Sequence, residues 1–597
     1  MAEHNYWSQR VSRRTALRGA GLGVAGLAGA ALIGCGGDDD DAAPAATAAA
    51  TQASGSVAAP AAGGMIDTPF SLAQIEDAPV AKRGGTFRAS SRSDVLPTKD
   101  VITTQGGARG TGAAVYSMMV QKKGTENKSD HPSLEISPDL GQSWEVTPDG
   151  LQYTFDIVKN AHITPPIDRQ LTTEDIVFSW DRWKALAVNP DQLDMIESMT
   201  APDDFTLVMK LNRPEGIFLN RLTDNFNFMV YPKEADGGYD PEKEMIGSGP
   251  WMLKEYTPSL VLRMERSPTW HGGPDRPYLD TYEVNYVPER AQEVNQFLGG
   301  NLDGVGSLSA ENGLRMIDAG MQWSNWGGTP GIGHIAFGDP RDGSAPWADD
   351  RVRKAVSLGL DRDKLYVAAF GIDKLKSAGI DWDIVWAAHV PAAMGKAWVD
   401  PKTDDGNVGK FINYDPAEAK KLLAAAGYPD GFKADFNYSI AYGTSWATEA
   451  EIIPQMLKDV GIDLTINVND HSSVYVPKTF KGDFTGLAYI LNAWPEPENY
   501  LSAFYTPGAG RNQSKVDDPA LLKEIRRVNS IFDLSERQGA IQDLLQVLAN
   551  KMYYVPAIGW SGPSWTAAQP YVKNWGKSKI ARGATYVVSY PTWWLDQ

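Results

Sequence analysis

Apolar residues recur with the period of a strand or of a helix over most of the chain. The stretch from Gly247 to Gly304 contains both patterns: a Gly/Pro turn, two short alternating strands, a second Gly/Pro turn, a third strand and a helix. An Asp-Gly turn at 149–150 separates two further strands, and Thr172 or Thr173 is placed to cap a helix with an acidic first turn. The first half of the chain is therefore expected to mix strands with helices.

The second half repeats a helix followed by a strand rich in β-branched residues. Apolar side chains have helical spacing over 352–360. The next helix has clear boundaries, with Asp415 as its cap, Pro416 in its first turn and Gly427 as its stop. Another helix, over 449–460, leads directly into a strand. This repetition predicts an α/β lobe.

The first 35 residues have the features of an export signal. Arg13 and Arg14 precede an apolar stretch, 19–34, that is shorter than the ~20 residues of a membrane-spanning helix. Paired arginines favour the twin-arginine route, with general secretion as the alternative. The sequence Leu-Ile-Gly-Cys that ends at Cys35 resembles a bacterial lipobox. This resemblance implies that Cys35 carries acyl chains and holds the protein on a membrane, whereas the alternative is a spare thiol.

Residues 36–81 are predicted to form a flexible tether. They begin with Gly-Gly and four consecutive aspartates, and an Ala/Thr/Pro/Gly run follows. Such a composition offers too little bulky apolar surface to offset the entropy cost of ordering.

Composition narrows the classes of function. The 597 residues carry a formal charge of −18, which argues against a nucleic-acid partner because a phosphate backbone requires a basic surface. The 19 Trp and 23 Tyr indicate packed lobes or an aromatic-lined cleft. Seven histidines lie scattered without zinc-type spacing, and no Gly-x-Ser-x-Gly, P-loop or His-Glu-x-x-His motif occurs. We therefore expect no catalytic residue, metal or cofactor.

Several short motifs resemble, in order, those of family 5 of the solute-binding proteins of ABC importers, the peptide and nickel binding group. The motifs are Lys-Arg-Gly-Gly-Thr-Phe-Arg at 82–88, Leu-Thr-Thr-Glu-Asp at 171–175, Gly-Ser-Gly-Pro-Trp at 247–251, Arg-Ser-Pro-Thr-Trp at 266–270, Pro-Tyr-Leu-Asp at 277–280 and Val-Arg-Lys-Ala-Val at 352–356. The resemblance implies an α/β fold of the periplasmic-binding-protein type, cluster C, with two lobes joined by hinge strands. On this basis the expected divisions are an export signal at 1–35, a tether at 36–81, lobe I at 82–330 with an extra subdomain at about 101–199, lobe II at 331–553, and a return to lobe I at 554–597.

The same resemblance places the solute near one turn of lobe II. In peptide-binding members an aspartate before an aromatic-Pro-acid-Pro turn holds the ligand's ammonium group. The turn here begins at Trp494, and Ala493 takes the place of the aspartate. Because a desolvated ammonium without a carboxylate costs roughly several kcal/mol, ordinary peptides require that Glu496 or Asn492 reach the same point. The residues expected to contact the solute are Trp494, Asn492, Glu496, Trp326, Tyr116 and Trp446, with core packing as the alternative for each aromatic ring.

The function implied is a receptor, anchored outside the cytoplasmic membrane or in the periplasm, that binds a peptide-like or other small solute. Its partners would be that solute, the membrane and the transmembrane subunits of an ABC permease, and no nucleic acid. Oligosaccharides, nickel chelates and quaternary amines remain alternative solutes. A secreted hydrolase or carbohydrate-active enzyme, which requires paired carboxylates about 5 to 9.5 Å apart, is the rival function, and a sensor or adhesion role is a third.

Overall fold

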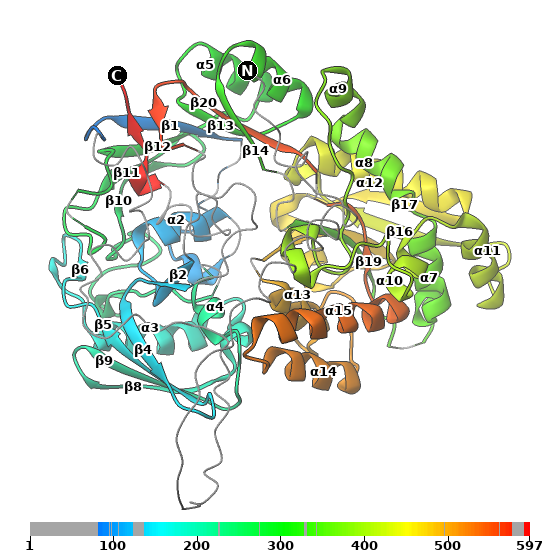
Figure 1. Ribbon diagram of the computed structural model, residues 1–597, viewed down its shortest axis with the longest axis horizontal. Coiled ribbons are helices and arrows are strands. Elements are labelled where there is room, and N and C mark those ends of the chain that lie inside the picture. Colours follow the sequence, from blue (N-terminus) through cyan, green and yellow to red (C-terminus); the bar gives the residue numbers. More distant parts are fainter. Residues whose placement is uncertain are drawn as a thin grey trace, which may run out of the picture.

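The computed structural model shows two bodies side by side, here called lobe I and lobe II (Figure 1). It describes residues 81–597 except 93, 95, 97, 105–106, 123–135, 225–226, 274, 327–330, 342, 495, 560–561 and 576–589. The predicted export signal, with Arg13, Arg14 and Cys35, and nearly all of the predicted tether lie outside the described residues. Among the residues that are described, no helix has the length and apolarity that a membrane crossing requires.

Lobe I contains β1 to β14 and β20 to β22. Its first sheet has the order β1 (Thr86–Ser91), β12 (Thr281–Tyr286), β11 (Val261–Arg266), β10 (Trp251–Thr257). Its second has the order β4 (Gly141–Val146), β5 (Gln152–Ile157), β9 (Thr206–Leu211), β8 (Ile196–Asp203). Short pairs are β2 (Val120–Lys122) with β3 (Ile136–Pro138), β6 (His162–Ile163) with β7 (Arg169–Gln170), and β21 (Val572–Lys573) with β22 (Trp594–Leu595). The helices are α2 (Gly107–Val115), α3 (Thr173–Leu186) and α4 (Phe218–Leu222).

These elements confirm the local predictions for the first half. β10 and β11 form the antiparallel pair expected after the first Gly/Pro turn, and β4 and β5 pair across the Asp-Gly turn. The helix α3 begins at Thr173, and the carboxylate of Asp175 accepts the backbone N–H of Thr172 at 3.0 Å, which is one half of a capping box.

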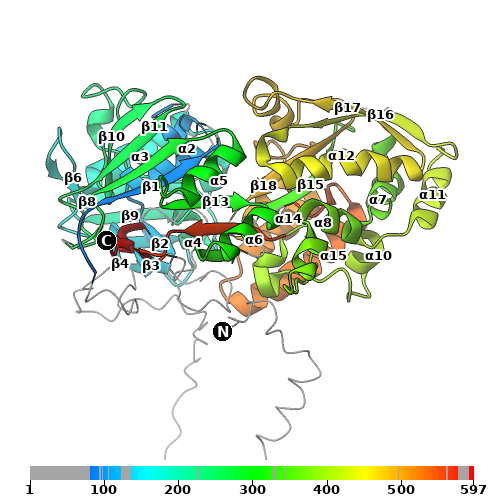
Figure 2. The same ribbon diagram turned by 90° about the horizontal axis from the view of Figure 1, so that it is seen from above.

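A third sheet of lobe I lies beside lobe II. It consists of β13 (Gly304–Leu308), β20 (Ser564–Ala568) and β14 (Gln322–Trp326), and it is flanked by α5 (Arg290–Leu298) and α6 (Ala310–Asp318). The middle strand β20 comes from near the end of the chain and is antiparallel to both neighbours. The core of lobe II continues under this sheet, since Trp565 and Phe297 belong to the same buried cluster as Ile335. Seen from above, β13, β15 and β18 lie in the middle of the molecule (Figure 2).

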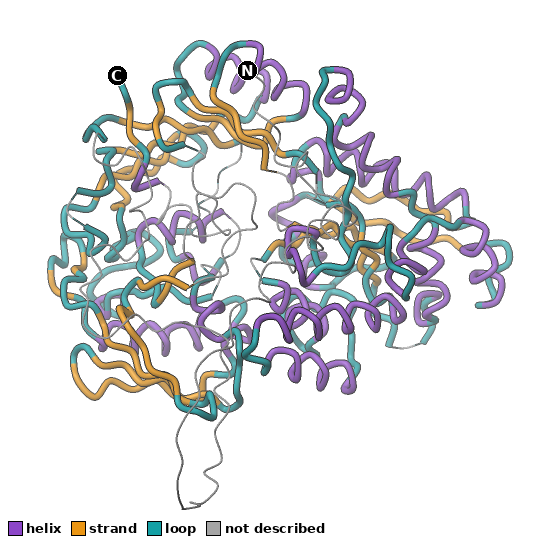
Figure 3. The backbone as a smooth tube through the Cα atoms, in the orientation of Figure 1, coloured by secondary structure: helices purple, strands orange, loops and turns teal. Residues whose placement is uncertain are grey.

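Lobe II is built on one five-stranded sheet surrounded by helices, whereas strands predominate in lobe I (Figure 3). The strand order is β17 (Ile462–Val468), β16 (Phe432–Tyr438), β18 (Leu487–Ala493), β15 (Gly331–Phe337), β19 (Val555–Pro556). The helices are α7 (Asp350–Leu358), α8 (Arg362–Phe370), α9 (Ile372–Ser377), α10 (Asn407–Ile412), α11 (Pro416–Ala425), α12 (Thr444–Asp459), α13 (Pro497–Tyr505), α14 (Pro519–Asn529) and α15 (Leu534–Lys551). The predicted cap of α11 is confirmed, because Asp415 accepts the N–H of Glu418 at 2.9 Å.

The core of lobe II contains two almost fully buried histidines. His334, on β15, is 1% exposed, and the rings of Phe504 and Tyr554 lie 4.7 and 4.9 Å from it. His389 is 2% exposed. Burial lowers the pKa of each to about 3 because the imidazolium would be desolvated, and the charge of Arg362 adds to the effect on His389.

We expect lobe II to lose stability as the pH falls from about 6.5 toward 3. A histidine whose pKa is lower in the folded chain binds fewer protons there, so its contribution is intact above the unfolded pKa and decreases by about 1.4 kcal/mol per pH unit within this window. His334→Gln, neutral at every pH, should flatten the dependence of the free energy of unfolding on pH, measured by urea denaturation. His162→Gln, in the partly exposed β6, is the control, and an unchanged slope in His334→Gln would contradict the assignment.

Candidate functional site

Two connections join the lobes, one from β14 to β15 and one from β19 to β20. Next to these connections, β15 and the segment after β19 pass close to each other at two glycines. A Cβ atom on Gly559, whose φ is 53°, would lie 2.1 Å from the backbone nitrogen of Gly333. A Cβ on Gly333 would lie 2.4 Å from the hydroxyl of Tyr489. Only glycine therefore fits at either position, and the crossing is a compact hinge between the lobes.

A buried carboxyl group fastens this hinge to lobe II. Glu449, on α12, is fully buried and accepts hydrogen bonds from the Tyr489 hydroxyl and, at 3.1 Å, from the backbone N–H of Gly559. Burial raises the pKa of Glu449 well above its usual value, which favours the neutral acid. The ring of Trp446 stacks on Tyr489 at 3.9 Å, so this predicted site residue lies one turn from Glu449 beside the hinge.

The lobes also meet at a second place, here called the seam, where α4 contacts α13 (Figure 1). Arg221, on α4, is 2% exposed and donates from Nε to Glu215 at 3.0 Å. Its other nitrogens donate across the seam to Asn499 Oδ1 at 3.3 Å and Ser502 Oγ at 3.1 Å. Within lobe I it also donates to Gln192 Oε1 at 3.4 Å, so a desolvated arginine of lobe I divides its hydrogen bonds between the two lobes.

Backbone contacts reinforce the seam. The N–H of Gly216 donates to the carbonyl oxygen of Asn529 at 2.7 Å. A Cβ on Gly216 would lie 2.2 Å from the carbonyl oxygen of Ile531, so only glycine permits this approach. Next to it, Asn220 Nδ2 donates to Glu496 Oε1 at 3.1 Å.

The predicted solute-binding turn runs from the hinge to the seam. Ala493 ends β18 opposite Gly331, the first residue of β15 after the crossing. Glu496 is 3% exposed and accepts the hydrogen bond from Asn220 of lobe I. The structure therefore places Asn492, Ala493, Trp494 and Glu496 along the boundary between the lobes, which is where a solute between them would lie.

Three predicted site residues lie together on this segment. Trp494 is 7% exposed, and its backbone N–H donates to the Tyr500 hydroxyl at 2.9 Å. Its ring packs edge to face against the rings of Tyr500 and Phe504. Asn492 is 4% exposed, and its Nδ2 has no hydrogen-bond partner among the described residues. The segment thus combines a packed aromatic ring, an unsatisfied donor and a carboxylate.

The other predicted residues lie elsewhere. Tyr116 is fully buried in lobe I and stacks on Tyr231 at 4.1 Å. Trp446 is fully buried in lobe II, and its Nε1 donates to the carbonyl oxygen of Ser439. Trp326 lies on β14 beside the hinge, and its side chain is outside the description. In the described part of the chain, no group of three or more His, Cys, Asp or Glu is placed to hold a metal ion.

The carboxyl ends of three strands of the lobe II sheet lie together beside the turn, at what is here called one edge of the sheet. β16, β17 and β18 are parallel, so Tyr438, Val468 and Ala493 end at the same edge, from which β15 starts. Large apolar side chains stay exposed there, with Ile440 58% and Val468 56% exposed. Ligands of open α/β sheets bind at the carboxyl ends of strands, and this edge faces the crossing to lobe I.

Comparison with known proteins agrees with this arrangement. The profile of "Bacterial extracellular solute-binding proteins, family 5 Middle" matches residues 135–512, more than half of the chain. The chain is 25% identical over 428 residues to the dipeptide-binding protein of Escherichia coli, covering 64% of this chain and 73% of that protein. It is 24% identical over 512 residues to heme-binding protein A of Haemophilus influenzae, covering 80% of this chain and 86% of that one.

Solved structures confirm the expected two-lobed fold of the periplasmic-binding-protein type. DppA from Helicobacter pylori, in complex with the peptide STSA, has a TM-score of 0.72 at 19% identity and covers 86% of this chain and 99% of its own. AgaA from A.tumefacien R10, in complex with agropinic acid, has the same TM-score, identity and coverage. The chain belongs to family 5 of the bacterial extracellular solute-binding proteins, the non-enzymatic substrate receptors of ABC importers.

Proposed function

We propose that this receptor captures a peptide-like or opine-like solute between its lobes and delivers it to a membrane permease. The observation that carries the proposal is the course of segment 492–496 from the hinge to the seam. Similar structures hold peptides and, in AgaA, agropinic acid, which supports this range of solutes. The exposed apolar side chains at the same edge of the sheet favour a solute with an apolar portion.

The solute is recognised, on this proposal, through its oxygen atoms rather than through a free ammonium group at position 493. Ala493 offers no carboxylate, and the nearby Glu496 carboxylate already accepts a hydrogen bond from Asn220. The Asn492 amide provides a buried donor, and a donor left unsatisfied costs about 1–3 kcal/mol, which a carbonyl or carboxylate oxygen of the solute would recover. Trp494 would then hold the segment in place by packing on α13.

The export route and the anchor are also proposals. Arg13 and Arg14 direct the precursor to the twin-arginine pathway, and Cys35 receives the acyl chains that hold the receptor on the membrane. The run of residues 36–81 then gives the folded part its reach.

Peptides with blocked amino termini should bind as well as those with free ones, because no carboxylate stands at position 493. Thermal-shift screening of opines and of matched free and blocked peptides tests this, and a ligand at 100 times its Kd adds about 2.7 kcal/mol to the free energy of unfolding.

Asn492→Leu, which keeps the volume but removes the donor, should raise the Kd of the best solute about tenfold or more without lowering the stability of the free protein. Strict dependence on a free amino group, or an unchanged Kd in the variant, would refute this mode of recognition.

Arg221→Met should destabilise the protein by about 3–5 kcal/mol, because the buried carboxylate of Glu215 loses its principal partner. The double variant Arg221→Met with Glu215→Gln removes both charges and should recover most of that stability in urea denaturation. Both variants still lack the hydrogen bonds to α13, so both should bind solute more weakly than the wild type. Normal solute affinity in the stable double variant would show that the seam does not contribute to capture.

Cys35→Ala should move the receptor from the membrane fraction to the soluble extracytoplasmic fraction, because no acyl chain can be attached. Fractionation with immunodetection measures the change. Arg13→Lys with Arg14→Lys is the matched test of the export route, and it should retain the precursor in the cytoplasm. A Cys35→Ala protein that stays on the membrane would overturn the lipid anchor.

A further inference from the structure

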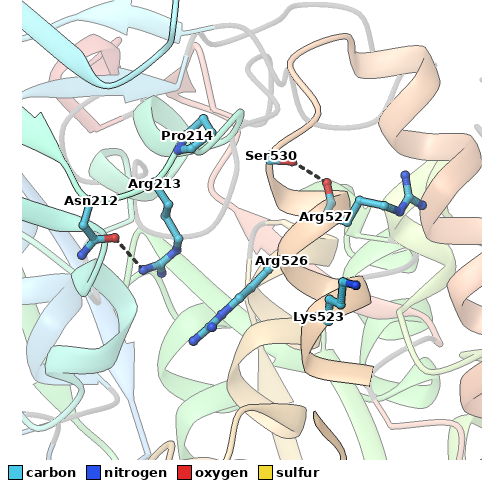
Figure 4. A pocket seen from close by; sticks show the side chains of 7 residues that line it. All are labelled: Asn212, Arg213, Pro214, Lys523, Arg526, Arg527 and Ser530. Atoms are coloured by element: carbon cyan, nitrogen blue, oxygen red, sulfur yellow. Dashed lines mark hydrogen bonds between the residues drawn. The ribbon is translucent and has the colours of Figure 1, made fainter. Parts of the chain in front are cut away.

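A basic pocket of about 560 Å³ lies between the lobes, beside the seam (Figure 4). One wall belongs to the segment after β9 in lobe I and the other to α14 in lobe II. The lining residues are Asn212, Arg213, Pro214, Lys523, Arg526, Arg527 and Ser530. The pocket thus has four cationic side chains and no acidic one in a chain whose formal charge is −18.

Two of these cations have an ion-pair partner. Arg213 pairs with Asp194 and, at 3.9 Å, with Glu215, and it donates to Asn212 Oδ1 at 3.0 Å. Arg527 pairs with Glu524 at 2.6 Å. The side chains of Lys523 and Arg526 form neither an ion pair nor a hydrogen bond with any residue that the structure describes. The pocket therefore retains about two positive charges after the neighbouring carboxylates are taken into account.

Of the three arginines of the pocket, Arg213 and Arg526 extend toward each other from opposite lobes, whereas Arg527 points away (Figure 4). Arg213 and Arg526 also line a smaller adjoining pocket together with Asp194 and Arg221. The position of Arg526 and Arg527 in the last turn of α14 is explained by the helix dipole, but the dipole does not explain why Arg213 extends toward Arg526.

We propose that this pocket binds a phosphate-type oxyanion, which bridges Arg213 and Arg526 and has Lys523 beside it. Guanidinium groups bind such anions through paired, charge-assisted hydrogen bonds, and a dianion would match the two uncompensated charges. Because the walls belong to different lobes, the bound anion stabilises their contact and acts as an effector of closure. The pocket is lined by none of the residues of segment 492–496, so the anion is not the transported solute.

The oxyanion has two sources with the same chemistry. One is free inorganic phosphate in the medium, and the other is the phosphate of an anionic lipid headgroup on the membrane to which the receptor is proposed to be attached. Only the free ion can occupy the pocket when no membrane is present. The two sources are therefore separated by assays with and without vesicles.

The test is titration of the purified protein with inorganic phosphate at constant ionic strength, with chloride replaced stepwise. We expect the melting temperature to rise with the logarithm of the phosphate concentration, and the radius of gyration in solution scattering to decrease. Lys523→Ala with Arg526→Ala should weaken phosphate binding in calorimetry about tenfold or more. The matched control is Lys420→Ala with Lys458→Ala, which removes two exposed lysines of α11 and α12 and should bind phosphate like the wild type.

Flotation with phosphatidylglycerol vesicles tests the second source, with phosphatidylcholine vesicles as the neutral comparison. Binding to phosphatidylglycerol that is lost in Lys523→Ala with Arg526→Ala, without an effect of free phosphate, would assign the pocket to a lipid headgroup. Equal responses of the pocket variant and the control variant, to phosphate and to vesicles alike, would overturn the proposal. None of these outcomes depends on the identity of the transported solute.

Discussion

The relation between the lobes depends on the close approach of two backbones at the hinge. Gly333 and Gly559 lie so near each other that a single methyl group on Gly559 would overlap the backbone at Gly333. Glu449 fixes this crossing in place because its Oε2 accepts a hydrogen bond from the backbone N–H of Gly559. The Tyr489 hydroxyl donates to the same oxygen. Since β18 carries Tyr489 and then continues to Ala493, the strand that supports the hinge is also the strand that presents the proposed solute-binding segment. A shift in the crossing would therefore displace the strand that carries this segment.

The seam differs from the hinge in its chemistry. It joins Arg221, Asn220 and Gly216 of lobe I to side chains and backbone of lobe II mainly through hydrogen bonds. Buried ion pairs contribute little net stability, because the cost of desolvation offsets the attraction, but they penalise any arrangement that leaves a charge without its partners. The hydrogen bonds from Arg221 to Asn499 and Ser502 would be lost in any other arrangement, so they define one relative position of the lobes more strongly than they stabilise that position.

The sequence predicted the local structure better than the contacts between distant segments. The motif at 247–251 was a strong signal because Gly247 and Gly249 pack against the carbonyl oxygen of Val115 at the end of α2, where a Cβ would lie 2.2 Å and 2.8 Å from that atom. Helix caps such as Asp415 were predictable for a different reason, because their partners are only three residues away in the sequence. Arg221 carried no comparable signal. Its partners Asn499 and Ser502 follow about 280 residues later, and only the folded chain brings them together. The insertion of β20 between β13 and β14 was likewise invisible in the local pattern.

A polar seam suits a receptor that must release what it captures. Apolar burial at the seam would add about 25 cal/mol for each Å² removed from water and would hold the lobes together whether or not a solute were present. Hydrogen bonds exchanged with water contribute only about 0.5–1.5 kcal/mol each, so the open and closed arrangements remain close in free energy. On these proposals, a solute that satisfies the Asn492 donor, or an anion that bridges Arg213 and Arg526, needs only a few kcal/mol of differential affinity to change their populations.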